Sequence, residues 1–162
     1  MDINPYKFIA PWDAYEFANH VLDSGAELVV LSMAWLSHSL TKEEINGDRR
    51  TEPELETLSY WVERFRPVVA GERQVIVVIG NRCGIEGGDV CNTSTGAGDM
   101  PETAEVCYAG SSTVIRIGKG KVELWDVLGK GEERCLLVDT EEAPRYVLQT
   151  GPGQQGENTN TM

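Results

Sequence analysis

The sequence of 162 residues has no long apolar run, which argues against a membrane-spanning segment. Its runs of large apolar residues are short, and that at 28–31 is interrupted at Ser32, whereas a helix that crosses a bilayer needs roughly 20 apolar residues. Basic residues are also few, because 14 Lys and Arg stand against 26 Asp and Glu and leave a formal charge of −12. Such a chain repels phosphate backbones and anionic lipids, so we expect neither nucleic acid nor a membrane as a partner.

Histidine and cysteine are scarce as well. His20 and His38 are the two histidines, and no spacing in the sequence places them in a Ser–His–Asp or His–Cys arrangement. The cysteines are too widely spaced for a CxxC metal knuckle and too few to staple a chain of this length, so we predict reduced thiols, no metal and no cofactor. They lie at Cys83, Cys91, Cys107 and Cys135.

Targeting and phosphate-binding motifs are also missing. The first residues contain neither a basic segment followed by an apolar one nor an Arg-rich amphipathic pattern, so a cytoplasmic or nuclear location is expected. The glycine-rich stretches 84–88 and 96–98 fit neither a phosphate loop nor the dinucleotide fingerprint. The carboxylates at 52, 54 and 56 are better explained as complements of a helix dipole than as an acid–base pair.

The sequence does contain the pattern of two amphipathic helices. Apolar residues recur at spacings of three and four over 11–24, where Gly25 provides a stop. A second stripe runs from residue 51 to about residue 67, where Thr51 and Glu54 have the spacing of a capping box and Pro67 should kink or end the helix. The polar stretch between them, 37–50, predicts a loop or a short exposed helix.

Strand patterns alternate with these helices. The nearly continuous apolar run 28–35 and the β-branched run 74–79 predict strands that are covered on both faces. The stretch 83–105 predicts a long irregular loop, and a Gly-Lys-Gly turn predicts a hairpin of 112–117 with 121–127. A short strand is expected at 134–140 and a disordered tail at 149–162, which leaves one α/β domain over 1–148 with a mixed sheet covered by two helices.

Three stretches of the sequence resemble one enzyme family. They are MDINPYKF at 1–8, LVVLSMAW at 28–35, and YAGSS at 108–112 with its Gly-Lys-Gly hairpin. They are similar to the C-terminal half of carbon–nitrogen hydrolases of the nitrilase superfamily, and most similar to the N-terminal amidase subgroup. The helix 54–66 and the strand and turn at 75–82 fit the same order of elements, so the resemblance covers about residues 1–140.

The resemblance implies a four-layer αββα sandwich in which a Glu, a Lys and a Cys hydrolyse an amide through an acyl-enzyme. In the subgroup, this removes ammonia from an N-terminal Asn or Gln within the N-degron pathway. It places the nucleophilic Cys immediately before Met1, so that this chain is the C-terminal part, truncated on its N-terminal side and inactive alone. An incomplete sheet with an open apolar face is then expected, and the sandwich commonly forms dimers.

By the same resemblance, some residues of this chain line the substrate pocket. Met1 follows the nucleophile, and Asp2 either pairs with the α-amino group of a peptide or protein N-terminus or caps the following turn. Trp35 either lines the cleft or is a tryptophan at the edge of the core. Asn81 and Arg82 either orient the pocket or satisfy loop carbonyls.

Two other functions remain open at this stage. The chain fits a non-catalytic binding or assembly protein built on the nitrilase remnant, and it also fits an unrelated acidic α/β domain. The coding sequence upstream of Met1 discriminates between the enzyme and the remnant, because an in-frame strand ending in Cys, with Glu and Lys further upstream, would restore the catalytic residues.

Overall fold

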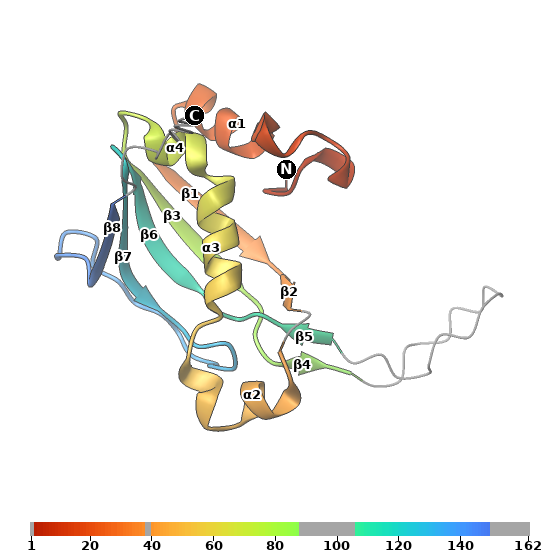
Figure 1. The fold of residues 1–162 in the computed structure, drawn as a ribbon. Coiled ribbons are helices and arrows are strands. Elements are labelled where there is room, and N and C mark those ends of the chain that lie inside the picture. Colours follow the sequence, from red (N-terminus) through yellow and green to blue (C-terminus); the bar gives the residue numbers. More distant parts are fainter. Residues whose placement is uncertain (1, 38–39, 88–105, 150–162) are drawn as a thin grey trace, which may run out of the picture.

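A five-stranded sheet with helices on one face forms the body of the protein (Figure 1). The computed structural model describes residues 2–37, 40–87 and 106–149. The large sheet has the order β1-β3-β6-β7-β8, and a smaller sheet has the order β2-β5-β4. The strands are β1 (Leu28–Met33), β2 (Leu36–Ser37), β3 (Val75–Asn81), β4 (Ile85–Glu86), β5 (Val106–Tyr108), β6 (Thr113–Gly118), β7 (Lys121–Val127) and β8 (Tyr146–Gln149).

The helices are short. The α-helices are α1 (Glu16–Ser24), α2 (Lys42–Asn46), α3 (Leu55–Arg64) and α4 (Arg66–Ala70). Three 3-10 turns precede or separate them: η1 (Tyr6–Phe8), η2 (Trp12–Ala14) and η3 (Asp48–Thr51). The α/β class, the mixed sheet and its helical cover are therefore confirmed.

The sheet is mixed because β1 and β3 run parallel while the remaining pairs are antiparallel. The expected hairpin is present as β6 and β7, with a bulge after Val114. The prediction of a strand at 134–140 is wrong, because that stretch is irregular and the last strand of the sheet is instead β8. Gln149 pairs with Lys121 and belongs to the sheet, while the rest of the expected tail, 150–162, lies outside the described residues. The expected loop at 83–105 contains β4, and its residues 88–105 also lie outside.

Both predicted helices start later than expected. The first begins at Glu16 because Tyr15 has a φ of 42°, a left-handed conformation that no helix continues through. The capping box between Thr51 and Glu54 is wrong: Glu54 is itself the N-cap, and its carboxylate accepts from the N–H of Thr57 at 2.6 Å. The expected break is confirmed, since α3 ends before Phe65. The short helix predicted as an alternative within 37–50 is α2, with a capping box of its own.

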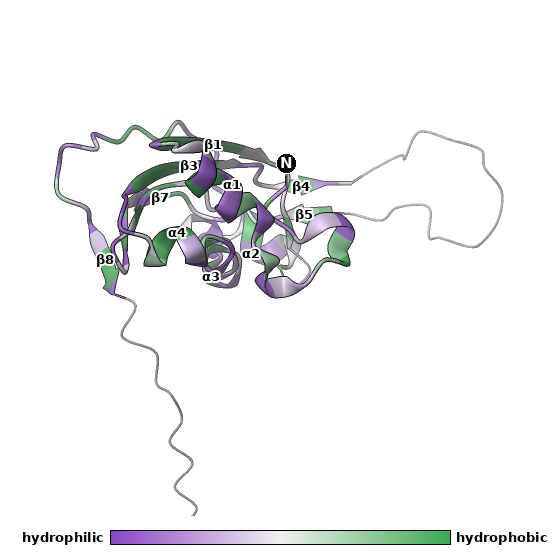
Figure 2. Cartoon of the chain, turned by 90° about the horizontal axis from the view of Figure 1, so that it is seen from above, coloured by the Kyte–Doolittle hydropathy of each residue, from purple (hydrophilic) through white to green (hydrophobic). Residues whose placement is uncertain are grey.

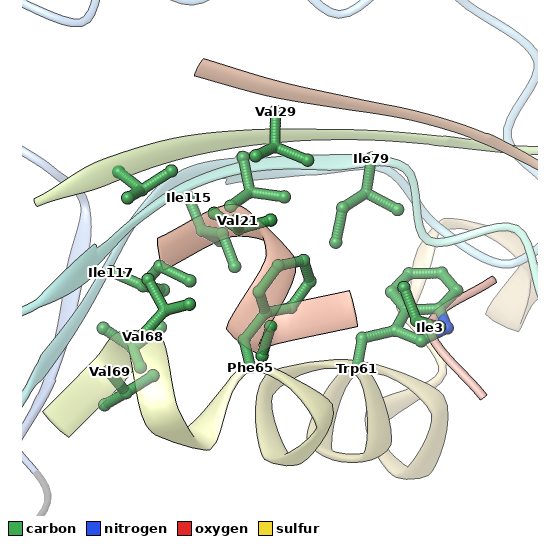
Figure 3. Packing of buried hydrophobic residues seen from close by; sticks show 14 residues of the cluster. Ile3, Val21, Val29, Trp61, Phe65, Val68, Val69, Ile79, Ile115 and Ile117 are labelled. Carbon is green, nitrogen blue, oxygen red and sulfur yellow. The ribbon is translucent and has the colours of Figure 1, made fainter. Parts of the chain in front are cut away.

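The core lies between the sheet and the helices (Figure 3). Trp61 and Phe65 project from the end of α3 toward the sheet, where Ile79 and Ile115 face them. All four side chains are at most 2% exposed. Burial of such large side chains contributes roughly 1.5–3 kcal/mol each, so this layer stabilises the packing of α3 on the sheet.

A buried guanidinium fastens the N-terminal segment to α3. Arg64 is 1% exposed. It donates from Nε to the Ile3 carbonyl at 2.8 Å and from Nη1 to the Trp12 carbonyl at 2.6 Å. Its guanidinium also lies over the rings of Trp12 and Tyr15, at 4.7 and 5.1 Å from their centroids. A buried charge needs such compensation, so this one side chain fixes the N-terminal segment at two of its carbonyls.

On the opposite face of the sheet, no helix of the described residues is present (Figure 2). Leu28 and Val30 of β1 are 58% and 67% exposed there. Ile76 and Val78 lie opposite them in β3 and are half-buried. Among the described residues, the run 28–35 is therefore not covered on both faces as expected, and the β1 end of this face presents exposed apolar side chains.

We expect the Arg64→Met variant to lose about 3 kcal/mol of unfolding free energy, because it leaves the buried Ile3 carbonyl and the partly buried Trp12 carbonyl without this donor. The N-terminal segment should then become accessible to limited proteolysis before the sheet unfolds. The matched control is Arg66→Met, whose exposed guanidinium pairs with Glu63 at 3.3 Å and should change stability by less than about 1 kcal/mol. Equal losses in both variants, measured by denaturant unfolding, would contradict the anchoring role.

The open face should make the isolated chain self-associate, because contiguous exposed apolar surface favours association in water. Replacing Leu28 and Val30 together by Lys should shift the chain toward monomer while the circular-dichroism spectrum is preserved. Sedimentation of both forms at equal concentration provides the measurement. A wild-type chain that stays monomeric and binds no hydrophobic dye would refute the expectation.

Candidate functional site

A cavity of about 730 Å³ lies at the carboxyl end of β1, beside the N-terminal segment. Met33 of β1 pairs with Asn81 of β3, so the ends of the two parallel strands meet here. Ligand sites in open α/β sheets commonly lie at this edge. The cavity is lined by Asp2, Ile3, Asn4 and Phe8 from the N-terminal segment and by the six residues 31–36.

Asp2 stands at this cavity and also stabilises the turn that follows it. Its Oδ1 accepts from the backbone N–H of Asn4 at 3.2 Å, and the amide of Asn4 donates to both carboxylate oxygens. The side chain is otherwise exposed. The position of Asp2 is therefore compatible with both roles expected from the sequence. The carboxylate caps the turn, and its oxygens can still accept a hydrogen bond from a group in the cavity.

Tyr60 of α3 binds the side-chain oxygen of Asn4. Its hydroxyl donates to Asn4 Oδ1 at 2.6 Å. Burial raises the pKa of the Tyr60 phenol, the positive charge of Arg64 opposes this, and the negative charge of Asp2 adds to the increase. The hydroxyl therefore stays protonated and keeps its role as donor throughout the neutral range.

Trp35 lines the cavity and belongs to a cluster of aromatic rings behind the cavity wall. Trp35 lies 5.0 Å from Tyr60 and 6.2 Å from Trp61 between ring centroids, and Trp12 packs edge-on against Tyr60 at 5.4 Å. Trp35 thus lines the cavity and contacts the core at the same time. Tyr60 was not singled out from the sequence, where its position next to the apolar stripe of α3 gave no separate signal.

Asn81 positions Trp35. Its Oδ1 accepts from the Trp35 backbone N–H at 2.7 Å, and its amide donates to the carbonyls of Gly110 at 2.9 Å and Trp35 at 3.4 Å. The side chain therefore connects the end of β1, the end of β3 and the turn before β6, and it does not itself line the cavity.

Arg82 is not among the residues that line the cavity. Its guanidinium stacks on the Tyr108 ring at 4.4 Å from the centroid and pairs with Glu86 at 3.2 Å. A hydrogen bond from the Tyr108 hydroxyl, with the positive charge of Arg82, lowers the pKa of Glu86. This trio lies on the small sheet, so the structure brings Asp2 and Trp35 together, with Asn81 behind them, but not Arg82. Met1 lies outside the described residues.

The stretch YAGSS at 108–112 fastens the sheet to the start of α3. Ser111, fully buried, accepts from the N–H of Glu54 at 2.8 Å, and the Ser112 hydroxyl bridges the backbone N–H and carbonyl of Asn81. Gly110 has a φ of 55°, and a Cβ there would lie 2.4 Å from the carbonyl oxygen of Lys130. Only glycine fits this position, which gives a physical reason for a motif noted by resemblance alone.

The chemistry available at the cavity is recognition of a cation. A carboxylate beside aromatic faces attracts an ammonium group. Among the described residues that line the cavity there is no cysteine. Cys83 lies outside the cavity, and burial raises the pKa of its thiol, an effect to which the negative charge of Glu133 adds. Within the described ranges, no group of three His, Cys, Asp or Glu side chains is arranged to hold a metal ion.

Within residues 2–37, 40–87 and 106–149, no helix has the length and apolar character needed to span a bilayer.

Comparison with known proteins gives two relatives with the same description. Over 156 residues, 88% of this chain, the sequence is 26% identical to a protein N-terminal amidase of Schizosaccharomyces pombe, of which the match covers 46%. A stretch of 45 residues, 27% of the chain, is 44% identical to a protein N-terminal amidase of Saccharomyces cerevisiae, of which it covers 10%. The chain thus spans less than half the length of either relative. No family model matches the sequence, and no solved structure does.

We expect Asn81→Asp to destabilise the protein increasingly as the pH rises from about 4 to 7, because a carboxylate would face the Gly110 and Trp35 carbonyls. Those carbonyls raise the folded-state pKa of the new acid above its unfolded value of about 3.9, so the protonated form keeps the donor and stability is lost on deprotonation. Thermal melts across this range, with tryptophan emission as the local readout, measure the effect. Asn19→Asp, on an exposed face of α1, should show little pH dependence, and equal slopes for both variants would contradict the role of Asn81.

Proposed function

We propose that this chain forms one substrate-binding wall of an amidohydrolase that removes ammonia from the side-chain amide of an N-terminal Asn or Gln. The observation that carries the proposal is Asp2, whose carboxylate lines a cavity walled by aromatic rings. A free α-amino group is the positive charge that distinguishes a peptide N-terminus from an internal amide. Both relatives named above are protein N-terminal amidases, which supports the same substrate.

The reaction needs a nucleophile that the described part of the cavity does not contain. By resemblance to the nitrilase superfamily, a Cys directly before Met1 attacks the side-chain amide carbon. Ammonia leaves with a proton from the general acid, and water then attacks the thioester to release the carboxylate and regenerate the thiol. A Glu serves as base and a Lys stabilises the oxyanion. All three would be supplied by residues outside this sequence, and the chain alone would be inactive.

The open face of the sheet supports this arrangement. In the superfamily a second sheet packs on the corresponding surface, and here Leu28, Val30 and the half-buried residues beside them present an apolar surface suited to such packing. The cavity lies at the β1 edge of the same sheet, so a segment that covers this surface comes close to Asp2.

A non-catalytic binding protein is the second candidate. It is favoured by one observation: a carboxylate and aromatic side chains line the cavity, and this combination binds an ammonium group without any nucleophile. In that case Asp2 and the rings bind a peptide N-terminus without converting it.

The two candidates separate in an assay of ammonia release from peptides that begin with Asn or Gln. The chain alone should release none, whereas a fusion with an upstream half that carries Glu and Lys and ends in Cys before Met1 should be active. Within this fusion, Asp2→Asn should lower kcat/KM by about 10- to 100-fold, the loss expected for a charge-assisted hydrogen bond. N-acetylated peptides should be equally poor substrates for the fusion and for its Asp2→Asn variant.

Asp13→Asn is the matched control, because Asp13 is an exposed carboxylate on the same N-terminal segment and should leave kcat/KM unchanged. A fusion that binds the peptides but stays inactive favours the binding protein. Turnover by the 162-residue chain alone that disappears when one of its own cysteines is replaced would overturn the placement of the nucleophile.

A further inference from the structure

A second cavity of about 360 Å³ adjoins the first. Trp35 and Leu36 line both cavities, so the indole and its neighbour form the partition between them. The Tyr60 ring lines the second cavity while its hydroxyl binds Asn4 at the edge of the first. The remaining wall comes from the end of β2 and the start of α3, which contributes Glu54 and Glu56.

The lining of the second cavity is one-sided in charge. It contains two carboxylates and two aromatic side chains, and among the described residues neither a Lys nor an Arg lines it. The Trp35 and Tyr60 rings lie 5.0 Å apart and are tilted by 44°, and aromatic faces attract cations. This combination of ring faces and carboxylates matches the chemistry of a Lys or Arg side chain.

The two carboxylates differ in what they already bind. Glu54 is 7% exposed and caps α3 through its bond from the Thr57 N–H. Glu56 is exposed and has neither a hydrogen bond nor an ion pair within the part of the chain that the structure describes. Nearby Glu52, in contrast, is held by Arg49 at 2.8 Å. Glu56 is therefore the carboxylate at this cavity that is available to a ligand.

We infer that the second cavity binds the cationic side chain of a Lys or Arg that directly follows the N-terminal residue of the substrate. This rests on the proposed function, which places the α-amino group at Asp2. Successive side chains of an extended peptide point to opposite sides, so two cavities divided by the Trp35 indole suit two successive residues. The inference narrows the substrate class to N-terminal Asn or Gln followed by a basic residue.

Peptide binding to the 162-residue chain, immobilised through its C-terminus so that it does not self-associate, tests the inference. The peptides begin Asn-Lys, Asn-Ala or Asn-Glu and are otherwise identical. Wild type should bind Asn-Lys on the order of fivefold more tightly than Asn-Ala, the range of an exposed charge pair with a cation–π contact, and should bind Asn-Glu least tightly.

The Glu56→Gln variant should lose most of this preference while its affinity for the Asn-Ala peptide is unchanged. Glu72→Gln is the matched control, since it removes the same charge from an exposed position between α4 and β3, and it should keep the preference. Equal affinities for the three peptides, or equal effects of the two variants, would overturn the second subsite and leave the proposed function standing. Failure of every Asn peptide to bind would overturn both.

Discussion

The buried guanidinium of Arg64 is the constraint on which the candidate site depends. A cation this deep is stable only if its donors are satisfied, and the acceptors it finds are carbonyls of Ile3 and Trp12 on a segment with little regular structure. One turn earlier on α3, Tyr60 binds Asn4. The helix thus fixes the N-terminal segment at several points, which places Asp2 at the cavity without any strand or long helix in that segment.

The same helix is fixed at its other end by the sheet. Ser111 accepts from the backbone N–H of Glu54, while Ser112 and Asn81 bind one another across the ends of β3 and β6. Asn81 in turn holds Trp35 through the backbone. Side chains that line the cavities are therefore supported by a hydrogen-bonded layer behind them, and changes in that layer should act on the site through Trp35.

The sequence predicted the sheet and its helices well because apolar spacing reports which residues are buried. It predicted helix starts poorly, since these depend on single residues: Tyr15 in a left-handed conformation, and Glu54 as cap in place of Thr51. The strand β8 was missed because its burial is slight and its pairing with β7 is long-range. Of the candidate site, Asp2 and Trp35, with Asn81 behind them, were predicted by resemblance, whereas the positions of Tyr60 and Glu56 depend on tertiary packing that no local pattern records.

Strand β1 is more exposed than its apolar sequence predicts, and this strand belongs to both the fold and the site. A continuous apolar run is typical of a strand with two covered faces, yet Leu28 and Val30 are exposed on one of them. In the described sheet β1 is also an edge strand, with β3 as its neighbour on one side. The first cavity lies at the end of this strand. A segment that covers this face or pairs with this edge would therefore lie beside the cavity, so the edge strand β1 belongs both to the incomplete part of the fold and to the wall of the site.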